Sequence, residues 1–308
     1  MKALIIDLKN QAVFFPEDIE RVKHALERDF HIYAILRSHK YYLKPDDLTY
    51  YKNKIILPVF SPTKESSFTI PFQVYKDLDH KLIRIDSQYP YEKFSVIIED
   101  EKWKSQHPEK EFCIEYNLTK ISDKFLFQSL SDYDYKVLYI GKSYGKAGER
   151  EAVDRLKNHS TLQKILADCQ NKYVGYNIHI LLLDFKQDQL GKIINRGSLS
   201  TIVSSSPHFE EQQIINITEA SLIHYFKPEY NKDFIINFPS ENHSSYSTIY
   251  NDGCTELAID LSYLFEAEHF PSLKLHTEHR YISKEKKYIH YKLKESETVL
   301  TSYPFDND

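Results

Sequence analysis

The sequence predicts an α+β fold built around a core at residues 121–237. In this core two β-rich runs, 124–130 and 136–141, are neighbours in the chain, and segments with helical periodicity follow them. The whole chain of 308 residues contains 41% hydrophobic and 14% aromatic residues, which is enough for a substantial buried interior. A disordered tail is therefore excluded, and a globular protein with mixed secondary structure is expected.

Residues 1–120, before the core, are expected to form a mixed α/β accessory or recognition domain. The first residues, MKALIID, predict a strand, and residues 16–30 predict a helix with Pro16 near its start. No catalytic motif is found in this region. Extended segments are expected at 31–36, 54–60, 68–75 and 81–98.

The core itself is expected to follow the order β-β-α-α-β-α. Ser160 and Gln163 have the spacing of a capping box, so a second helix is expected to open at Ser160, close enough to end the preceding helix near His159. A proline stops a helix, which places the end of the last one before Pro228. The expected elements are a strand at 124–130, a hairpin loop at 131–135, a strand at 136–141, a helix at 148–158, the helix opening at Ser160, a strand at 176–185 and a helix at 210–226.

Residues 238–308, after the core, are expected to form a β-rich C-terminal extension. The glycines are distributed unevenly, because none of the seven precedes Gly141 and six lie between 141 and 197. Glycine serves where backbone turns tightly or approaches another group closely. A site on tight backbone near Gly141 and ordinary loop chemistry both account for this pattern.

The positions of several polar residues in the core indicate a binding or catalytic site. Arg155 and His159 are four residues apart, so they would share one face of a continuous helix. Glu219 lies on the apolar stripe of its helix, where a carboxylate is costly unless a charge or a metal satisfies it. Two explanations stay open for Glu219: ligation of Mg²⁺ or Mn²⁺, which favour oxygen ligands, or a salt bridge such as one to Arg155.

Taken in order, these residues resemble the catalytic core of the GIY-YIG nucleases, which cut phosphodiester bonds with one bound divalent metal. The residues that carry the resemblance are Tyr139-Ile140-Gly141, Arg155 with His159, and Glu219 with Asn231. The resemblance implies a three-stranded antiparallel sheet flanked by helices. The family's first strand motif would fall on residues 125–127, where its glycine is missing and Phe127 replaces its tyrosine.

The resemblance also implies a role for each residue. Arg155 would bind the scissile phosphate, His159 would lie near the phosphate or the attacking water, and Tyr139 would point into the same cleft. Asn231 would hold the phosphate or fix its loop, and Glu219 would bind Mg²⁺ or Mn²⁺. Substrate-binding positions are expected at Gly141, Lys142 and Lys157.

The general base is left open by Phe127, because phenylalanine has no hydroxyl group. Tyr139, Tyr116, Tyr144 or His159 would have to accept the proton, or the enzyme is impaired.

Charge does not favour a nucleic-acid partner. The formal net charge is −5, and residues 121–237 contain fourteen Lys and Arg residues against fourteen Asp and Glu residues. Local basic groups could still form one face, which permits DNA binding without supporting it. They are Lys136, Lys142, Lys146, Arg150, Arg155, Lys157 and Lys164.

Three functions therefore compete at the level of sequence. The leading one is a cytoplasmic metal-dependent endonuclease, acting on DNA or alternatively RNA, with restriction or phage defence as its setting by analogy. The second is a catalytically impaired protein of the same fold that binds nucleic acid or another partner, and the third is a purely structural α+β protein. Three scattered cysteines suit a reducing compartment, and neither a secretory signal nor an apolar run long enough to span a membrane is found.

Overall fold

The structure is a computed structural model of the 308-residue chain. The residues that it describes are 2–26, 29–51, 54–61, 63, 66–73, 81–118, 133–144, 152–172, 174–188, 193–196, 199–202, 204–205, 208–238, 245–266 and 273–293.

The chain forms two compact units. The first comprises residues 1–38, 131–172 and 178–308, and the second comprises residues 39–130 and 173–177. This division differs from the expected order of three consecutive domains, because the first unit takes segments from all three. Its strands are β1 (Lys2–Phe14), β2 (Ile32–His39), β10 (Tyr133–Lys142), β11 (Tyr176–Gln187), β12 (Ile193–Arg196), β13 (Leu199–Ile202), β14 (Ser204–Ser205), β15 (Cys254–Asp260), β16 (Leu273–His276), β17 (Tyr281–Ile282) and β18 (Tyr288–Lys292).

The helices of the first unit are mostly short. They are η1 (Pro16–Asp18), α1 (Ile19–Ala25), α4 (Ala152–Lys157), α5 (Ser160–Cys169), α6 (Glu211–Phe226), α7 (Ser247–Asn251) and α8 (Tyr263–Glu266).

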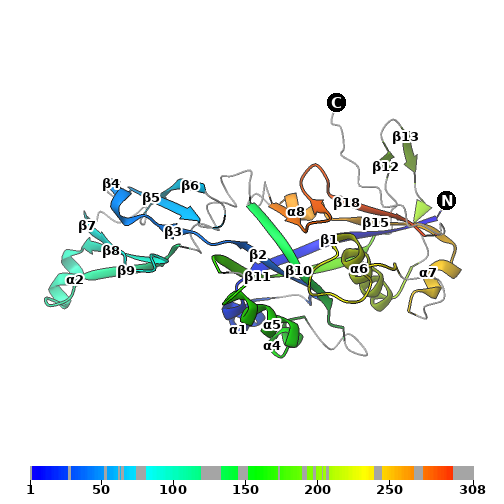
Figure 1. Ribbon diagram of the computed structural model, residues 1–308, viewed down its shortest axis with the longest axis horizontal. Coiled ribbons are helices and arrows are strands. Elements are labelled where there is room, and N and C mark those ends of the chain that lie inside the picture. Colours follow the sequence, from blue (N-terminus) through cyan, green and yellow to red (C-terminus); the bar gives the residue numbers. More distant parts are fainter. Residues whose placement is uncertain are drawn as a thin grey trace. The chain divides into compact units, whose positions relative to one another are not determined.

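A mixed nine-stranded sheet organises the first unit. Its order is β17-β16-β10-β2-β11-β1-β15-β18, and β14 also pairs with β1. The pairs β1–β15 and β10–β16 are parallel, whereas β1–β11, β2–β10 and β15–β18 are antiparallel. Figure 1 shows β2 and β10 side by side, although about ninety residues of sequence separate them.

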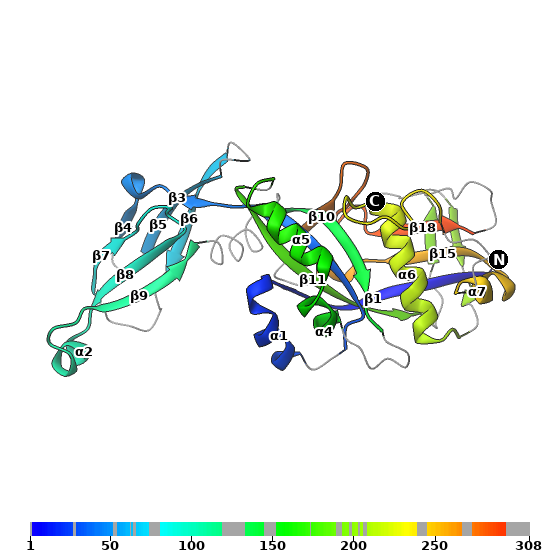
Figure 2. The same cartoon turned by 60° about the horizontal axis from the view of Figure 1, so that its bottom comes forward.

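The central strands are buried because their sequences are apolar on both faces. In β2, residues 32–36 are all buried, and in β11 so are residues 178–185. A continuous apolar run is typical of a strand that is covered on both sides. Helix α6 packs against β10, and Figure 2 shows α5 and α6 over the same face of the sheet.

The α+β class is confirmed, but the expected three-stranded sheet is wrong. The strands predicted at 136–141 and 176–185 are β10 and β11, and they are members of a larger sheet. The expected hairpin loop is also wrong in its second half, since β10 already begins at Tyr133. Residues 124–130, the expected partner strand, lie outside the described residues.

Two described segments occupy the edges of β10 along its motif. Strand β2 pairs with one edge of β10 along residues 139–141. The other edge is bonded by the turn after α6, where the Tyr230 N–H donates to the Leu138 carbonyl and the Asn231 side chain bonds to Ile140. In the described structure, both edges of β10 at residues 138–140 are therefore occupied.

The second unit contains two small antiparallel sheets, β3-β5-β4 with β6 on β5, and β7-β8-β9. No helix in the described part of the chain is long and apolar enough to cross a membrane. The elements of this unit are β3 (Tyr42–Leu43), η2 (Pro45–Asp47), β4 (Thr49–Tyr51), β5 (Lys54–Ser61), β6 (Ser66–Gln73), β7 (Lys81–Asp86), β8 (Lys93–Glu99), α2 (Glu101–Gln106) and β9 (Phe112–Asn117).

Candidate active site

Strand pairing brings two tyrosines together on one face of the sheet. Gly141 of β10 is opposite Tyr33 of β2, and Tyr139 is opposite Ile35. Residues two apart on a strand share a face, so Tyr33 and Tyr139 are diagonal neighbours. Their ring centroids are 6.2 Å apart, and each side chain affects the pKa of the other.

His159 joins these tyrosines through a hydrogen bond to Tyr33 and a ring contact with Tyr139. The Nε2 atom of His159 lies 3.0 Å from the Tyr33 hydroxyl, and the Leu162 N–H donates to His159 Nδ1 at 3.2 Å. Because Nδ1 accepts a hydrogen bond, the ring proton sits on Nε2, which donates to the Tyr33 oxygen. The hydrogen of the Tyr33 hydroxyl is then available for another acceptor.

A helix break puts His159 in this position. Helix α4 ends at Lys157, and His159 is the N-cap of α5, with extended backbone and a side chain that accepts from Leu162 N–H. The expected break near His159 is confirmed, so Arg155 and His159 do not share one helix, and the cap is His159 instead of Ser160. An N-cap side chain points back over the first turn, which directs the imidazole toward β2.

Gly141 is required because the Tyr33 ring crosses above it. A Cβ atom on Gly141 would lie 2.7 Å from the Tyr33 hydroxyl oxygen and 2.8 Å from a ring carbon of Tyr139. Contacts this short are not tolerated, so any side chain at this position would displace a tyrosine. The expectation of a close backbone approach near Gly141 agrees with this geometry.

Arg155 contributes charge to the tyrosine group. Its Nη1 donates to the Lys142 carbonyl oxygen at 2.7 Å, which fixes the guanidinium beside the end of β10. The positive charge acts on both Tyr33 and Tyr139, in each case favouring the ionised hydroxyl. The predicted Arg155–Glu219 salt bridge is not the one observed for Glu219.

Glu219 is paired with Lys142 instead. Lys142 Nζ lies 2.8 Å from Glu219 Oε2, and the Glu219 side chain is only 13% exposed. Apolar residues of α6 surround it, since Ile215, Leu222, Ile223 and Phe226 are all buried. The lysine thus supplies the positive charge that a carboxylate in this setting needs.

Asn231 fastens the chain after α6 to β10. Its Oδ1 accepts from the Ile140 N–H at 2.9 Å, and its Nδ2 donates to the Ile140 carbonyl at 2.8 Å. Of the two roles expected for this residue, the geometry supports fixing the loop. Helix α6 itself ends at Phe226, before Pro228 as predicted, with Lys227 in the left-handed conformation.

Burial governs the acid–base properties of the group. Burial raises the pKa of Tyr33 well above its usual value of 10, and the nearby Tyr139 and Glu219 act in the same direction. Burial likewise raises the pKa of Tyr139, against the opposing effect of Arg155. The pKa of His159 is lowered by burial and by Arg155, so the imidazole is neutral at pH 7.

The remaining expected positions lie elsewhere. Lys157 of α4 pairs with Glu20 of α1 at 2.8 Å and does not contact the tyrosine group. Part of the possible basic face is neutralised, because Lys136 is paired with Glu278 and Lys142 with Glu219. Lys146 and Arg150 lie outside the described residues.

Tyr33 is the functional residue that sequence reasoning missed. Of the alternatives for the missing base, Tyr139 and His159 belong to the group, and the Tyr144 hydroxyl donates to Glu211 at 3.4 Å. Tyr116 belongs to the second unit, where it stacks on Phe94. Phe127 lies outside the described residues. A tyrosine in the extended segment expected at 31–36 was the available signal, and it was weak in a chain with 24 tyrosines.

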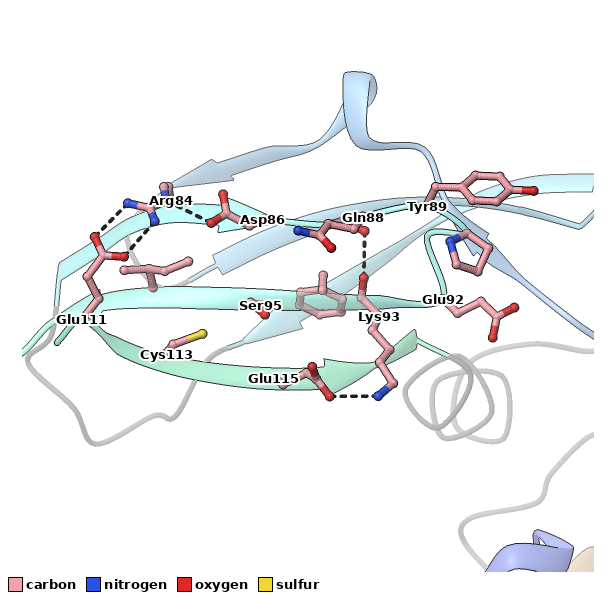
Figure 3. Close-up of a pocket in the computed structure, with 14 residues that line it drawn as sticks. Arg84, Asp86, Gln88, Tyr89, Glu92, Lys93, Ser95, Glu111, Cys113 and Glu115 are labelled. Atoms are coloured by element: carbon pink, nitrogen blue, oxygen red, sulfur yellow. Dashed lines mark hydrogen bonds and ion pairs between the residues drawn. The ribbon is translucent and has the colours of Figure 1, made fainter.

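A cavity of about 560 Å³ lies in the second unit, over the β7-β8-β9 sheet (Figure 3). Arg84 bonds to Glu111 and Asp86, and Lys93 bonds to Glu115, so these charges neutralise one another. None of the predicted site residues lines this cavity, and the side chains drawn in Figure 3 offer no free charge for a phosphate.

The donor set around Glu219 suits one kind of metal. Among the described residues, no group of three or more His, Cys, Asp or Glu side chains is placed to hold an ion, which does not suit a zinc site. Mg²⁺ and Mn²⁺ are different, because a hard cation in a phosphate enzyme is commonly held by one or two carboxylates together with waters and substrate phosphate. The partly accessible Glu219 carboxylate fits such an ion.

Comparison with known proteins gives no relative: no family model, no curated protein and no solved structure matches this chain.

Proposed function

We propose that this protein is a divalent-metal-dependent endonuclease of the GIY-YIG type that hydrolyses phosphodiester bonds. The observation that carries the proposal is the convergence of Tyr33, Tyr139, Arg155, His159 and Glu219 from five different segments of the chain. The nine-stranded sheet is larger than the fold implied by the resemblance, so the proposal rests on the site.

The position of Tyr33 removes the main objection to this function. Residues 31–33 read His-Ile-Tyr, and Tyr33 lies opposite Gly141, the last residue of Tyr139-Ile140-Gly141, in the antiparallel pair of β2 and β10. In our proposal this segment takes the place of the first strand motif, with histidine in the position of its glycine. A long insertion separates the two motifs along the sequence.

The charged residues have separate tasks in the proposed reaction. When bound at Glu219, Mg²⁺ or Mn²⁺ would stabilise negative charge on the phosphate and the leaving oxygen. Arg155 is held by the Lys142 carbonyl and presents its charge to the same region, where a guanidinium can pair with a phosphate. Lys142 is the second cation available to the substrate.

Tyr33, Tyr139 and His159 would handle the proton of the attacking water. The Tyr33 hydroxyl is protonated in the free protein, because its pKa is raised. It can accept a proton from water only as its own proton leaves, and that proton would pass through solvent to the leaving oxygen, which needs one. The His159 Nε2–H then stabilises charge that develops on the Tyr33 oxygen.

DNA is the substrate that we propose, with RNA as the alternative. The setting by analogy is restriction or phage defence in the cytoplasm. The paired state of Lys136, Lys142 and Lys157 is unfavourable for nonspecific phosphate binding, so affinity would depend on target-specific contacts.

A second candidate is a non-catalytic protein that binds nucleic acid or another partner. The Lys142–Glu219 ion pair favours it, because the buried carboxylate is already satisfied without a metal. Cleavage and metal dependence distinguish the two functions.

The test is cleavage of plasmid, linear duplex, single-stranded DNA and RNA with Mg²⁺ or Mn²⁺ and with EDTA. We expect metal-dependent cutting of DNA that is lost in Glu219→Gln. Glu211→Gln is the matched control, because Glu211 lies two turns earlier on α6 and pairs with Lys186 instead of Lys142. Cutting that persists in Glu219→Gln, or binding of DNA with no cleavage of any substrate, would contradict the proposal.

A further inference from the structure

The Lys142–Glu219 pair occupies the position where the proposed metal would bind. Lys142 Nζ lies 2.8 Å from Glu219 Oε2, and these side chains are 29% and 13% exposed. A cation ligated by the same carboxylate would lie within about 5 Å of the ammonium group, where like charges repel strongly. Metal and lysine therefore compete for one partially buried carboxylate.

The backbone around Lys142 is fixed while its ammonium group has a route outward. Its carbonyl accepts from Arg155 Nη1 at 2.7 Å, and the residue pairs with Ile32 across the sheet. The long side chain is the more exposed partner of the ion pair. A change of rotamer thus takes the ammonium away from Glu219 without moving β10 or Arg155.

We propose that Lys142 is a gate on the metal site: it neutralises Glu219 in the free protein and transfers to a substrate phosphate on binding, so that metal and substrate bind cooperatively. This inference rests on the proposed function. A substrate phosphate is negatively charged like the Glu219 carboxylate, so the Lys142 ammonium can pair with it instead. The Glu219 carboxylate is then free to bind the metal. The free protein accordingly binds metal weakly, which limits cleavage to the substrate complex.

The test measures Mn²⁺ binding to the free full-length protein from the electron paramagnetic resonance signal of unbound Mn²⁺, with no substrate and no activity readout. Removing the ammonium in Lys142→Met is expected to raise Mn²⁺ affinity about tenfold or more. Lys142→Arg keeps the charge and is expected to keep the weak affinity of the native protein. Glu219→Gln is expected to abolish the site in the native and the Lys142→Met backgrounds.

Lys157→Met is the matched control for general loss of a positive charge. Lys157 is 28% exposed and pairs with Glu20 at 2.8 Å, so it copies Lys142 in exposure and in pairing distance but does not touch Glu219. Its Mn²⁺ affinity is expected to stay at the native value. An equal rise in Lys157→Met and Lys142→Met would overturn the gate.

The outcomes separate this inference from the proposed function. If Glu219→Gln abolishes Mn²⁺ binding while Lys142→Met leaves the affinity unchanged, the gate is wrong and the metal site stands. If Mn²⁺ binding survives in Glu219→Gln, Glu219 is not the ligand, and both the metal site and the gate are wrong.

Discussion

The Tyr33 hydroxyl is the single group on which the proposed chemistry depends most. Tyr33→Phe removes it while keeping the ring that fills the space above Gly141. We expect the cleavage rate to fall by about 10²- to 10⁴-fold, the usual contribution of a positioned proton-transfer group, with a small change in melting temperature. The rate is measured at saturating Mg²⁺ on the preferred substrate.

Tyr116→Phe is the control for this experiment. Tyr116 was an alternative for the same role, but it lies on β9 of the second unit and stacks on Phe94. A large loss in Tyr116→Phe with none in Tyr33→Phe would reverse our assignment of the tyrosine.

Gly141 tests whether the two tyrosines must lie close together. In Gly141→Ala the new methyl group would lie 2.7 Å from the Tyr33 hydroxyl oxygen, so the ring must move. We expect a loss of about 1–3 kcal/mol in the free energy of unfolding, as for other overpacked sites, together with loss of cleavage. Denaturant unfolding and the cleavage rate measure the two effects.

Gly253→Ala is the control that distinguishes a general loss of stability from displacement of the two tyrosines. Gly253 has a φ of +82° and no atom near the position of an added Cβ, so alanine there is strained without a clash. We expect lower stability and native cleavage by the folded fraction. Native cleavage in Gly141→Ala would show that the tyrosine geometry is not critical.

At the scale of residues, sequence spacing predicted much of the site but not its partners. Tyr139, Arg155, His159, Glu219 and Asn231 come together as the motif order implied. The ion pair of Glu219 with Lys142 was not predicted. Helical spacing describes neighbours on one helix, whereas this pair joins a helix to a strand.

At the scale of elements, Asn231 links α6 to β10. Asn231→Ala leaves the Ile140 N–H and carbonyl without their side-chain partners, and we expect the free energy of unfolding to fall by about 1–3 kcal/mol. The exposed Asn158, between α4 and α5, is the control and should change little when replaced by alanine. If Asn231→Ala keeps full stability and loses only substrate affinity, its role is phosphate binding and not attachment of the loop.

Elements were predicted well where local signals are strong. Helix α6 has a clear apolar stripe and a proline after it, and it was expected at nearly its observed bounds. The break before α5 was expected from the spacing of Ser160 and Gln163, but the N-cap is His159, whose imidazole the capping-box pattern does not include. The partner of β10 was missed because the nearest β-rich run was assumed to pair with it.

At the scale of the whole molecule, pairings distant in sequence build the sheet. Strand β1 pairs with β11 and β15, and β2 pairs with β10 across the segment that forms most of the second unit. The spacing of apolar residues along a chain does not indicate which strands pair with each other across such an insertion. The α+β class was therefore predictable, while the nine-stranded order and the division into two units were not.

The stability of the first unit should depend on pH through His179. This residue is buried, its Nε2 lies 2.8 Å from the Ser38 hydroxyl, and its ring packs against Phe15 and Tyr135. Burial lowers its pKa from 6.5 to about 3. Between pH 6.5 and about 3, His179 is therefore protonated in the unfolded chain but neutral in the folded protein. The free energy of unfolding is greatest above pH 6.5 and declines as the pH falls toward 3.

The expected decline is about 1.4 kcal/mol for each pH unit below the unfolded pKa. His179→Gln removes the titrating group, and carboxylates common to both proteins cancel in the comparison. The difference in unfolding free energy between native protein and variant, measured by urea titration at neutral pH and about one unit below pH 6.5, should shrink by roughly that amount on acidification. A difference independent of pH would mean that His179 takes up a proton in the folded state, with Ser38 and the surrounding rings accommodating the charge.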